Sequence, residues 1–223
     1  MPASERPEEM ARFFDARAAG YEEHMWGLGP AMADFYRLVA EQVAETRTAV
    51  RLLDLGIGTG LELNGIFARA PNAIIHGIDL SRRMLGLLKR NHADRRRQIR
   101  LYRRSYETCA WPGAGFDYVV SVMTLHHLPP GRKLQLYRRI REALRDGGLY
   151  IEGDYTVSEE QEREGLVDYE RLIVEHGLNA AVAYHIDVPL CAATQVRLLT
   201  EAGFAGAKIV WEEDAKAVFT ACR

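Results

Sequence analysis

The spacing of apolar positions changes along the chain. Near the N-terminus they recur every three to four residues, as in helices that bury one face. This pattern predicts helices from Glu8 to Ala19 and from Ala31 to about Thr46. From Val50 onward, short continuous apolar runs predict strands at Val50–Leu55, Ala73–Ile78, Ile99–Tyr102, Phe116–Val122 and Leu149–Gly153. Such runs are expected of strands that are buried on both faces of a sheet.

Helical stretches separate most of these strands. They are predicted at Leu61–Ala70, from Ser81 as N-cap to about His92, and at Leu134–Leu144. Alternation of strand and helix favours a doubly wound, mostly parallel α/β sheet with right-handed crossovers.

The last third departs from that alternation. A charged helical stretch runs from Ser158 to about His176, and a second helix from about Ala192 to Ala202. The pattern then predicts a terminal hairpin, in which a short polar turn joins two strands, Ala207–Trp211 and Ala217–Ala221. We expect a single domain of four segments, which are 1–48 (N-terminal helices and lid), 49–155 (cofactor-binding core), 156–190 (helical insertion) and 191–223 (helix plus hairpin).

Composition narrows the class of protein. The 223 residues are 48% hydrophobic and 27% charged, with a formal net charge of -2. This charge gives no indication that the protein binds nucleic acid or an anionic membrane. Three scattered cysteines form no CxxC pair, the N-terminus lacks a secretory pattern, and no run of apolar residues is long enough to span a membrane. We therefore expect a cytoplasmic protein.

The strongest candidate for chemistry is a glycine-rich loop after the first strand. Asp54 ends the strand, Gly56, Gly58 and Gly60 follow at alternate positions, and a helix begins beyond them. Ligands of doubly wound sheets bind at the carboxyl ends of the strands, where this loop lies. Asp79 ends the next strand and can accept hydrogen bonds from ribose hydroxyls. The third glycine of the dinucleotide fingerprint is absent, so an adenosine without a pyrophosphate fits better.

Four motifs together resemble the class I S-adenosylmethionine-dependent methyltransferases. They are DLGIGTG, GIDLSRRML, FDYVVSVMTLHHL and DGGLYIEGD, which begin at Asp54, Gly77, Phe116 and Asp146. The resemblance implies a Rossmann-like sheet of seven mostly parallel strands, with an antiparallel C-terminal hairpin and an N-terminal helical lid. It also implies S-adenosyl-L-methionine as the cofactor.

The same resemblance assigns cofactor-binding roles. These fall on Tyr21, Asp54, Gly56, Gly58, Gly60, Asp79, Leu80, Met84, Ser105, Tyr106, Ser121 and Val122. The glycines would pack against the methionine part and ribose, and Tyr21 would belong to the lid. Ser105 and Tyr106 stand where the family usually has an Asp-Ala pair at the adenine, which is a departure from its pattern.

The sequence identifies the residues that would bind the methyl acceptor less clearly than those that would bind the cofactor. His126 follows the fourth strand and is the candidate general base, and we expect Glu152, Asp154, Tyr155, Tyr184 and His185 to line the substrate pocket. No HxH or HxxxH spacing occurs, so no metal site is expected.

The preferred function is methyl transfer from S-adenosylmethionine to O, N or C of a small molecule. A tRNA wobble-uridine modification enzyme is a second candidate, and the arginines between Arg95 and Arg104 would be its basic surface. A solvated face is the simpler interpretation of these arginines. A nicotinamide-dependent reductase and a non-catalytic cofactor sensor are further alternatives, and the oligomeric state stays open.

Overall fold

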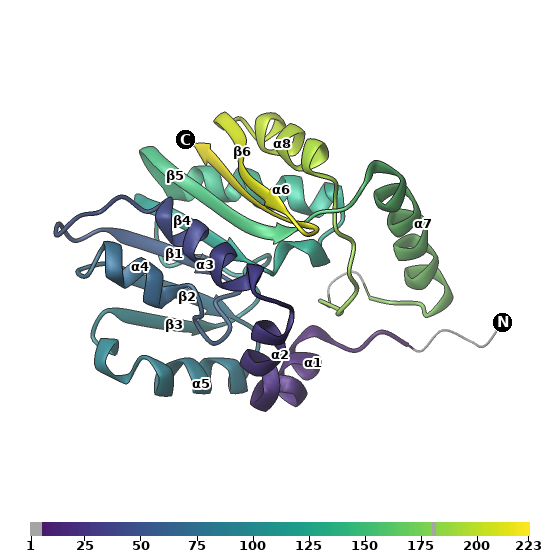
Figure 1. Cartoon of the computed structure of the whole chain (residues 1–223). Helices are drawn as coiled ribbons and strands as arrows, with labels where there is room; N and C mark the ends of the chain where they lie inside the picture. Colours follow the sequence, from purple (N-terminus) through teal and green to yellow (C-terminus); the bar gives the residue numbers. More distant parts are fainter. Residues whose placement is uncertain (1–5, 180–181) are drawn as a thin grey trace.

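A seven-stranded sheet organises the computed structural model, which describes residues 6–179 and 182–223. The strand order is β3-β2-β1-β4-β5-β7-β6, with β7 antiparallel to both of its neighbours and the other neighbouring pairs parallel. The strands are β1 (Arg51–Leu55), β2 (Ile74–Asp79), β3 (Ile99–Arg103), β4 (Phe116–Val122), β5 (Leu144–Tyr155), β6 (Ala205–Glu213) and β7 (Lys216–Cys222). This is the expected Rossmann-like fold with its antiparallel terminal hairpin (Figure 1).

Helices cover both faces of the sheet. The α-helices are α1 (Met10–Arg17), α2 (Tyr21–Gly27), α3 (Ala31–Glu41), α4 (Leu63–Arg69), α5 (Arg82–Asn91), α6 (Pro130–Ala143), α7 (Glu159–Glu175) and α8 (Ala192–Glu201). Helices α3, α4 and α5 pack with one face of the sheet in a first core, and α6 and α8 pack with the other face in a second. Burial of both faces explains the continuous apolar strands.

Several predicted boundaries need correction. The predicted N-terminal helix becomes three pieces, because a 3-10 turn at Ala18–Gly20 joins α1 to α2 rather than ending the helical region. Helix α6 begins at Pro130, four residues before its predicted start, since proline suits the first turn of a helix. The connection between β3 and β4 contains no helix, so the alternation of strand and helix fails there. Residues 1–5 of the predicted lid segment and 180–181 of the predicted insertion lie outside the described residues.

The N-terminal segment and the insertion after β5 contact each other. Glu9 forms an isolated antiparallel bridge with Tyr184, the Met10 N–H donates to the Ala183 carbonyl at 2.8 Å, and the His185 N–H donates to the Glu8 carbonyl at 2.9 Å. We call residues 8–10 and 183–185 the clasp. Two segments far apart in sequence thereby close over the same edge of the sheet.

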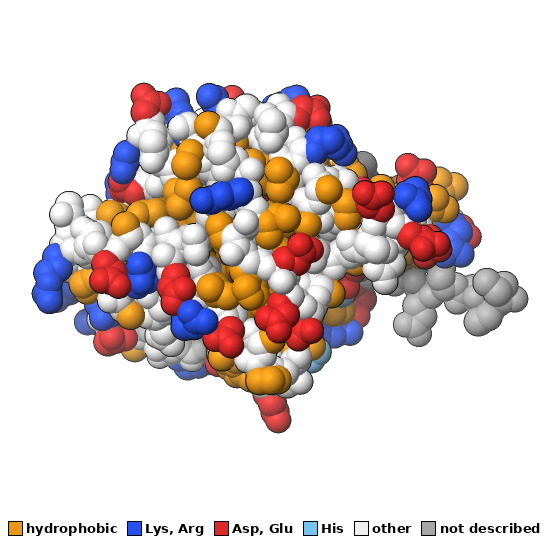
Figure 2. Space-filling model, turned by 45° about the horizontal axis from the view of Figure 1, so that its top comes forward, with side chains coloured by type: hydrophobic (Ala, Val, Ile, Leu, Met, Phe, Trp, Pro, Cys, Tyr) orange, Lys and Arg blue, Asp and Glu red, His pale blue; other side chains and the backbone are white. Residues whose placement is uncertain are grey.

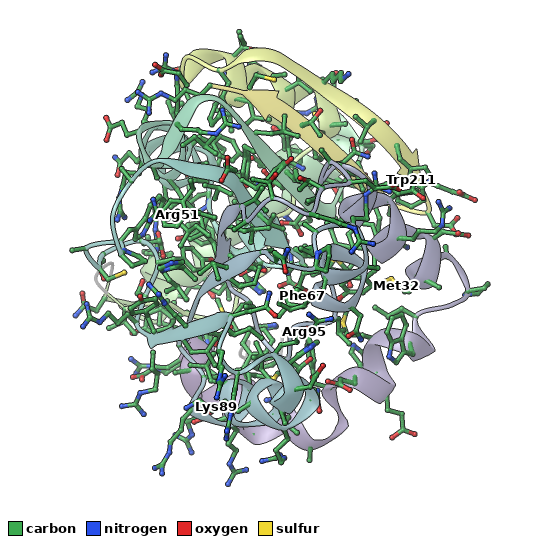
Figure 3. The ribbon with its side chains drawn as sticks, turned by 90° about the vertical axis from the view of Figure 1, so that its left-hand side faces the viewer. Met32, Arg51, Phe67, Lys89, Arg95 and Trp211 are labelled. Carbon is green, nitrogen blue, oxygen red and sulfur yellow. The ribbon has the colours of Figure 1, made fainter. Side chains whose placement is uncertain are left out.

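Arg95, the first of the arginines between Arg95 and Arg104, has a local structural role. The Arg95 guanidinium lies over the Phe67 ring, 4.9 Å from its centroid, and donates to the Pro71 carbonyl at 3.3 Å (Figure 3). Basic and acidic side chains are interspersed on the face that Figure 2 shows. Arg96, Arg97, Arg100, Arg103 and Arg104 are exposed, which favours a solvated face at these arginines. Within residues 6–179 and 182–223, no helix has the length and apolar character needed to cross a membrane.

Candidate active site

The glycine loop after β1 approaches the loop after β4 very closely. Gly56 has φ +76°, and a Cβ at this position would lie 2.3 Å from Oγ1 of Thr124. Only glycine fits there, on grounds of both backbone conformation and space. Gly58 has an open environment, and its N–H donates to Asp79 at 2.9 Å. The loop therefore presents bare backbone beside the acid that ends β2.

Gly60 is closely surrounded by side chains of α4, α5 and His92. A Cβ on Gly60 would lie 3.0–3.2 Å from side-chain atoms of Leu63, Leu88 and His92. The Gly60 carbonyl also lies 3.0 Å from Nε2 of His92. Its lack of a side chain lets α5 pack against the loop, and the predicted cofactor contact of this glycine stays a prediction.

Asp79 is held as an acceptor at the end of β2. Its Oδ2 accepts the Gly58 N–H at 2.9 Å, and its Oδ1 accepts the Ser81 N–H at 2.7 Å. Burial raises the pKa of Asp79 to about 6, although the backbone N–H donors oppose that rise. Above this pH the carboxylate is ionised and can accept hydrogen bonds from a pair of hydroxyl groups.

A cleft beside Asp79 contains most of the residues predicted to face the adenosine. Leu80, Ser105 and Tyr106 line it together with Gly56 and Thr124. Met84 is 1% exposed, and its N–H donates to the Ser81 hydroxyl at the start of α5, so it supports this wall from within the core.

The structure places two predicted residues deeper than expected. Ser121 and Val122 are buried in β4, and the Ser121 hydroxyl lies 2.7 Å from that of Tyr150. Met123, which has φ +52°, and Thr124 line the cavities. The strand-end rule could have identified both, because they directly follow the last residue of β4. The expected approach of Ser121 and Val122 to the cofactor through their backbone stays a prediction.

A larger cavity of about 620 Å³ lies between the N-terminal helices and the ends of β4 and β5. Its aromatic walls are Phe13, Phe14, Tyr21 and Tyr155, and its polar side chains include Arg17, His126, His127, His185 and Asp187. The Phe13 ring stacks on His185 with centroids 3.4 Å apart. The structure therefore brings together Tyr21, His126, Tyr155 and His185 as expected. Sequence reasoning missed the two phenylalanines, which lie in a segment without a motif.

His126 and Asp154 form a buried pair at the wall of this cavity. Nδ1 of His126 lies 2.6 Å from Oδ1 of Asp154, and the two residues are 6% and 1% exposed. Burial alone would raise the pKa of Asp154, but the charge and hydrogen bond of His126 and the charge of Lys133 lower it. An ionised Asp154 fixes the proton on Nδ1 and leaves the Nε2 lone pair free. Asp154 thus positions the histidine, which corrects the prediction that it lines the substrate pocket.

A second histidine–carboxylate pair lies beside the first. Nδ1 of His127 is 3.0 Å from Oδ1 of Asp187, and Nε2 of His126 is 3.8 Å from the same oxygen. Burial lowers the pKa of His127 to about 4, whereas the hydrogen bond from His127 helps to lower that of Asp187 to about 2, against burial. Ligand atoms of these three residues lie within 4.8 Å of one another and could hold a divalent metal. Sequence spacing could not reveal this cluster, because Asp187 comes from the insertion.

Two further predictions for the substrate pocket need correction. Glu152 is fully buried beneath α6, where it pairs with Lys133 at 2.9 Å and accepts hydrogen bonds from Tyr137 at 2.6 Å and Tyr150 at 2.9 Å. It does not reach the cavity, because α6 covers its face of the sheet. Tyr184 lines the cleft beside Leu80 rather than the larger cavity.

Comparison with known proteins identifies a domain within this chain. Residues 52–148 match the family model described as a methyltransferase domain. Residues 52–148 therefore carry a methyltransferase domain. Over 119 residues the chain is 32% identical to malonyl-[acyl-carrier protein] O-methyltransferase of Halorhodospira halophila (strain DSM 244 / SL1). The match covers 51% of the methyltransferase chain described here and only 37% of that relative's length.

Solved structures share the fold at low sequence identity. The DhpI–SAH complex has a TM-score of 0.71 and 18% identity, and the match covers 96% of this chain and 94% of DhpI. Human N-acetylserotonin methyltransferase in complex with SAM has a TM-score of 0.68 and 16% identity, with 100% of this chain and 60% of the human chain covered. The expected fold is confirmed.

The residues of this chain fit S-adenosylmethionine, the cofactor that the sequence motifs led us to expect. The loop at Gly56 and Gly58 leaves bare backbone, Asp79 offers a carboxylate for ribose hydroxyls, and Leu80 offers an apolar wall for adenine. Tyr21 is half-buried in the N-terminal cover and packs edge-to-face on Phe14, with ring centroids 6.2 Å apart.

Replacement of Asp79 by alanine should weaken cofactor affinity. A hydrogen bond to a charged group contributes about 1.5–3 kcal/mol, so the dissociation constant of S-adenosylhomocysteine should rise about 10- to 100-fold. Calorimetry at pH 7.5 measures this. Asp94→Ala serves as the control, because Asp94 is an exposed acid at the far end of α5. Equal affinities of Asp79→Ala and the unaltered protein would contradict the ribose assignment.

Proposed function

We propose that this methyltransferase methylates a hydroxyl oxygen of a small, largely planar molecule, with His126 as general base. The observation that carries the proposal is the buried His126–Asp154 pair, whose free imidazole nitrogen borders the cavity of about 620 Å³. The cavity volume suits a small-molecule ligand. Its flat aromatic walls, Phe13, Phe14, Tyr21 and Tyr155, suit a planar acceptor.

His126 removes the acceptor proton in this mechanism. The cofactor, when bound, supplies an activated methyl group, so the protein chiefly has to align the reactants. Nε2 of His126 accepts the hydroxyl proton while Asp154 holds Nδ1–H and stabilises the imidazolium that forms. Asp187, with Oδ1 3.8 Å from Nε2, places a second negative charge beside that cation. The aromatic walls exclude water from the reacting groups.

The same arrangement favours a small acceptor over RNA. The relatives named above include methyltransferases of acyl-carrier-protein-bound malonyl and of N-acetylserotonin. Met10, Ala183 and Tyr184 of the clasp line the cleft beside Asp79, and this cover disfavours entry of a polynucleotide there. Arg95 packs on Phe67, and the arginines from Arg95 to Arg104 do not line the described cavity.

Three further expectations complete the proposal. The chain acts as one methyltransferase domain, since strands from both ends of the sequence share one sheet. Transfer needs no resident metal, because Asp154 and Asp187 already orient the two histidines. The methyltransferase acts in the cytoplasm, where its three free cysteines would stay reduced.

An acceptor screen tests the proposal. Purified methyltransferase is incubated with S-adenosylmethionine and either a library of phenols, enols, carboxylic acids and amines or bulk tRNA, and S-adenosylhomocysteine is measured. We expect turnover with hydroxylated planar compounds, at the same rate with and without EDTA. Turnover on tRNA alone would overturn the small-molecule proposal. Loss of turnover in EDTA, restored by a divalent metal, would instead assign the cluster at His127 and Asp187 to a metal.

A further inference from the structure

A groove of about 460 Å³ lies between the last turns of α5 and the strand β3. Its floor is apolar and consists of Leu88 from α5 with Ile99 and Leu101 from β3, which share one face of that strand. Strand β3 is the outermost strand of the sheet, so the groove lies at the edge of the molecule's core. It shares no lining residue with the cleft beside Asp79 or with the larger cavity. Its volume suits a small molecule.

The rim of this groove is cationic. Lys89 on α5 (Figure 3) and Arg96, which follows the 3-10 turn Ala93–Arg95, are both exposed. Among the described residues neither cation pairs with a carboxylate, because Asp94 pairs with Arg95 at 3.5 Å. Residues 82–104 contain ten lysines and arginines and one acid, although the whole chain has a net charge of -2. Positive charge is therefore concentrated at this rim and attracts an anion.

The floor of the groove also contacts the glycine loop after β1. His92, another lining residue, is 5% exposed, and its Nε2–H donates to the Gly60 carbonyl at 3.0 Å. A Cβ on Gly60 would lie 3.1 Å from Nε2 of His92 and 3.2 Å from Cδ1 of Leu88. Two side chains of the groove thus pack directly on the loop. Because close-packed groups transmit displacement, a ligand that fixes these side chains also restrains the loop.

We propose that the groove binds an amphipathic anion, a small molecule with an apolar body and one carboxylate or phosphate group, and that its binding strengthens cofactor binding. The apolar body lies on the three apolar floor residues, and the anionic group lies between the two cations of the rim. The bound molecule braces His92 and Leu88 against Gly60 and so holds the loop in its cofactor-binding conformation. Such coupling is reciprocal, so the cofactor strengthens binding of the anion equally. The coupling uses the cofactor assignment, whereas the groove itself is independent of the acceptor chemistry proposed above.

Calorimetry with three simple probes tests the proposal. Octanoate, octyl phosphate and 1-octanol are titrated into the protein with and without saturating S-adenosylhomocysteine, and the two anions distinguish a carboxylate from a phosphate headgroup. We expect at least one anion to bind about tenfold or more tightly than 1-octanol, because only the anions engage the rim. Saturating S-adenosylhomocysteine should strengthen that binding about fivefold or more, and the anion should strengthen S-adenosylhomocysteine by the same factor.

Two charge-reversal variants locate the site. Lys89→Glu/Arg96→Glu should weaken anion binding about tenfold or more and remove the coupling. Arg97→Glu/Arg100→Glu is the matched control, because it changes the net charge equally while neither residue lines the groove. Arg100 alternates with Ile99 and Leu101 and so points to the other face of β3. The control should bind the anion as the unaltered protein does, and thermal unfolding followed by circular dichroism shows that both variants fold.

The outcomes that contradict the proposal are distinct. Unchanged anion affinity in Lys89→Glu/Arg96→Glu would place the anion elsewhere, and equal weakening in both variants would reduce the effect to general charge attraction; either result overturns the groove as the site. Anion binding that leaves the affinity for S-adenosylhomocysteine unchanged would overturn the coupling to the loop. Failure of S-adenosylhomocysteine to bind under all conditions would overturn the cofactor assignment, while direct titration of the anions would still test the groove.

Discussion

Replacement of His126 by alanine should lower turnover about 10²- to 10⁴-fold, the usual contribution of a positioned general base. Cofactor affinity should stay nearly intact, because His126 borders the acceptor cavity while Asp79 and the glycine loop lie in the neighbouring cleft. Single-turnover kinetics, with an acceptor found by the screen, would separate the chemical step from binding.

Two controls show whether His126 acts as a base or only fills space. His24 lines the same cavity but is exposed, so His24→Ala should change turnover little. Asp154→Asn keeps the volume while removing the carboxylate that fixes the proton on Nδ1, and it should lower turnover substantially. Unchanged turnover in His126→Ala would show that alignment alone suffices for transfer.

Replacement of Lys133 by methionine should destabilise the protein by about 3–5 kcal/mol. Lys133 and Glu152 are 1% and 0% exposed, and their charges lie 2.9 Å apart between α6 and β5. Nζ of Lys133 also donates to Gln195 of α8. Removal of the lysine alone leaves a buried carboxylate without its counter-charge. Denaturant unfolding followed by circular dichroism measures the change.

The double variant Lys133→Met/Glu152→Gln provides the internal control. It removes both charges, so it should recover much of the stability that the single variant loses. An exposed ion pair gives the comparison, because Arg197→Met on the surface of α8 should cost less than about 1 kcal/mol. A small effect of Lys133→Met would indicate that Glu152 takes up a proton when its partner is lost.

The central sheet was predictable because its strands are buried on both faces. Strand β4 has the predicted bounds, Phe116 to Val122, since few polar side chains interrupt it. Local sequence gave weaker signals where tertiary contacts decide the conformation. The β3–β4 connection is a loop because Arg139 of α6 donates to backbone carbonyls of Tyr106 and Cys109, a contact that spans about 30 residues.

The cofactor side of the site was predicted better than the acceptor side for a related reason. Asp79 and His126 follow the ends of parallel strands, so topology alone places them at one edge. Alternation placed Glu152 and Asp154 on one face of β5, but it could not show that α6 brings Lys133 over Glu152. Asp187 and Phe13 belong to segments outside the sheet, and only the folded chain brings them to the cavity.

The segments joined by the clasp line the proposed acceptor cavity, whereas other elements form the proposed cofactor cleft. Phe13 and His185, which stack in the cavity, are each carried by a segment that the clasp joins, whereas the glycine loop and Asp79 belong to the sheet. Sequence changes in the two clasped segments can therefore alter which acceptor fits without disturbing how the methyl donor is bound. Grafting both segments together from a relative should transfer acceptor preference, whereas a graft of either one alone would leave Glu9 and Tyr184 mismatched.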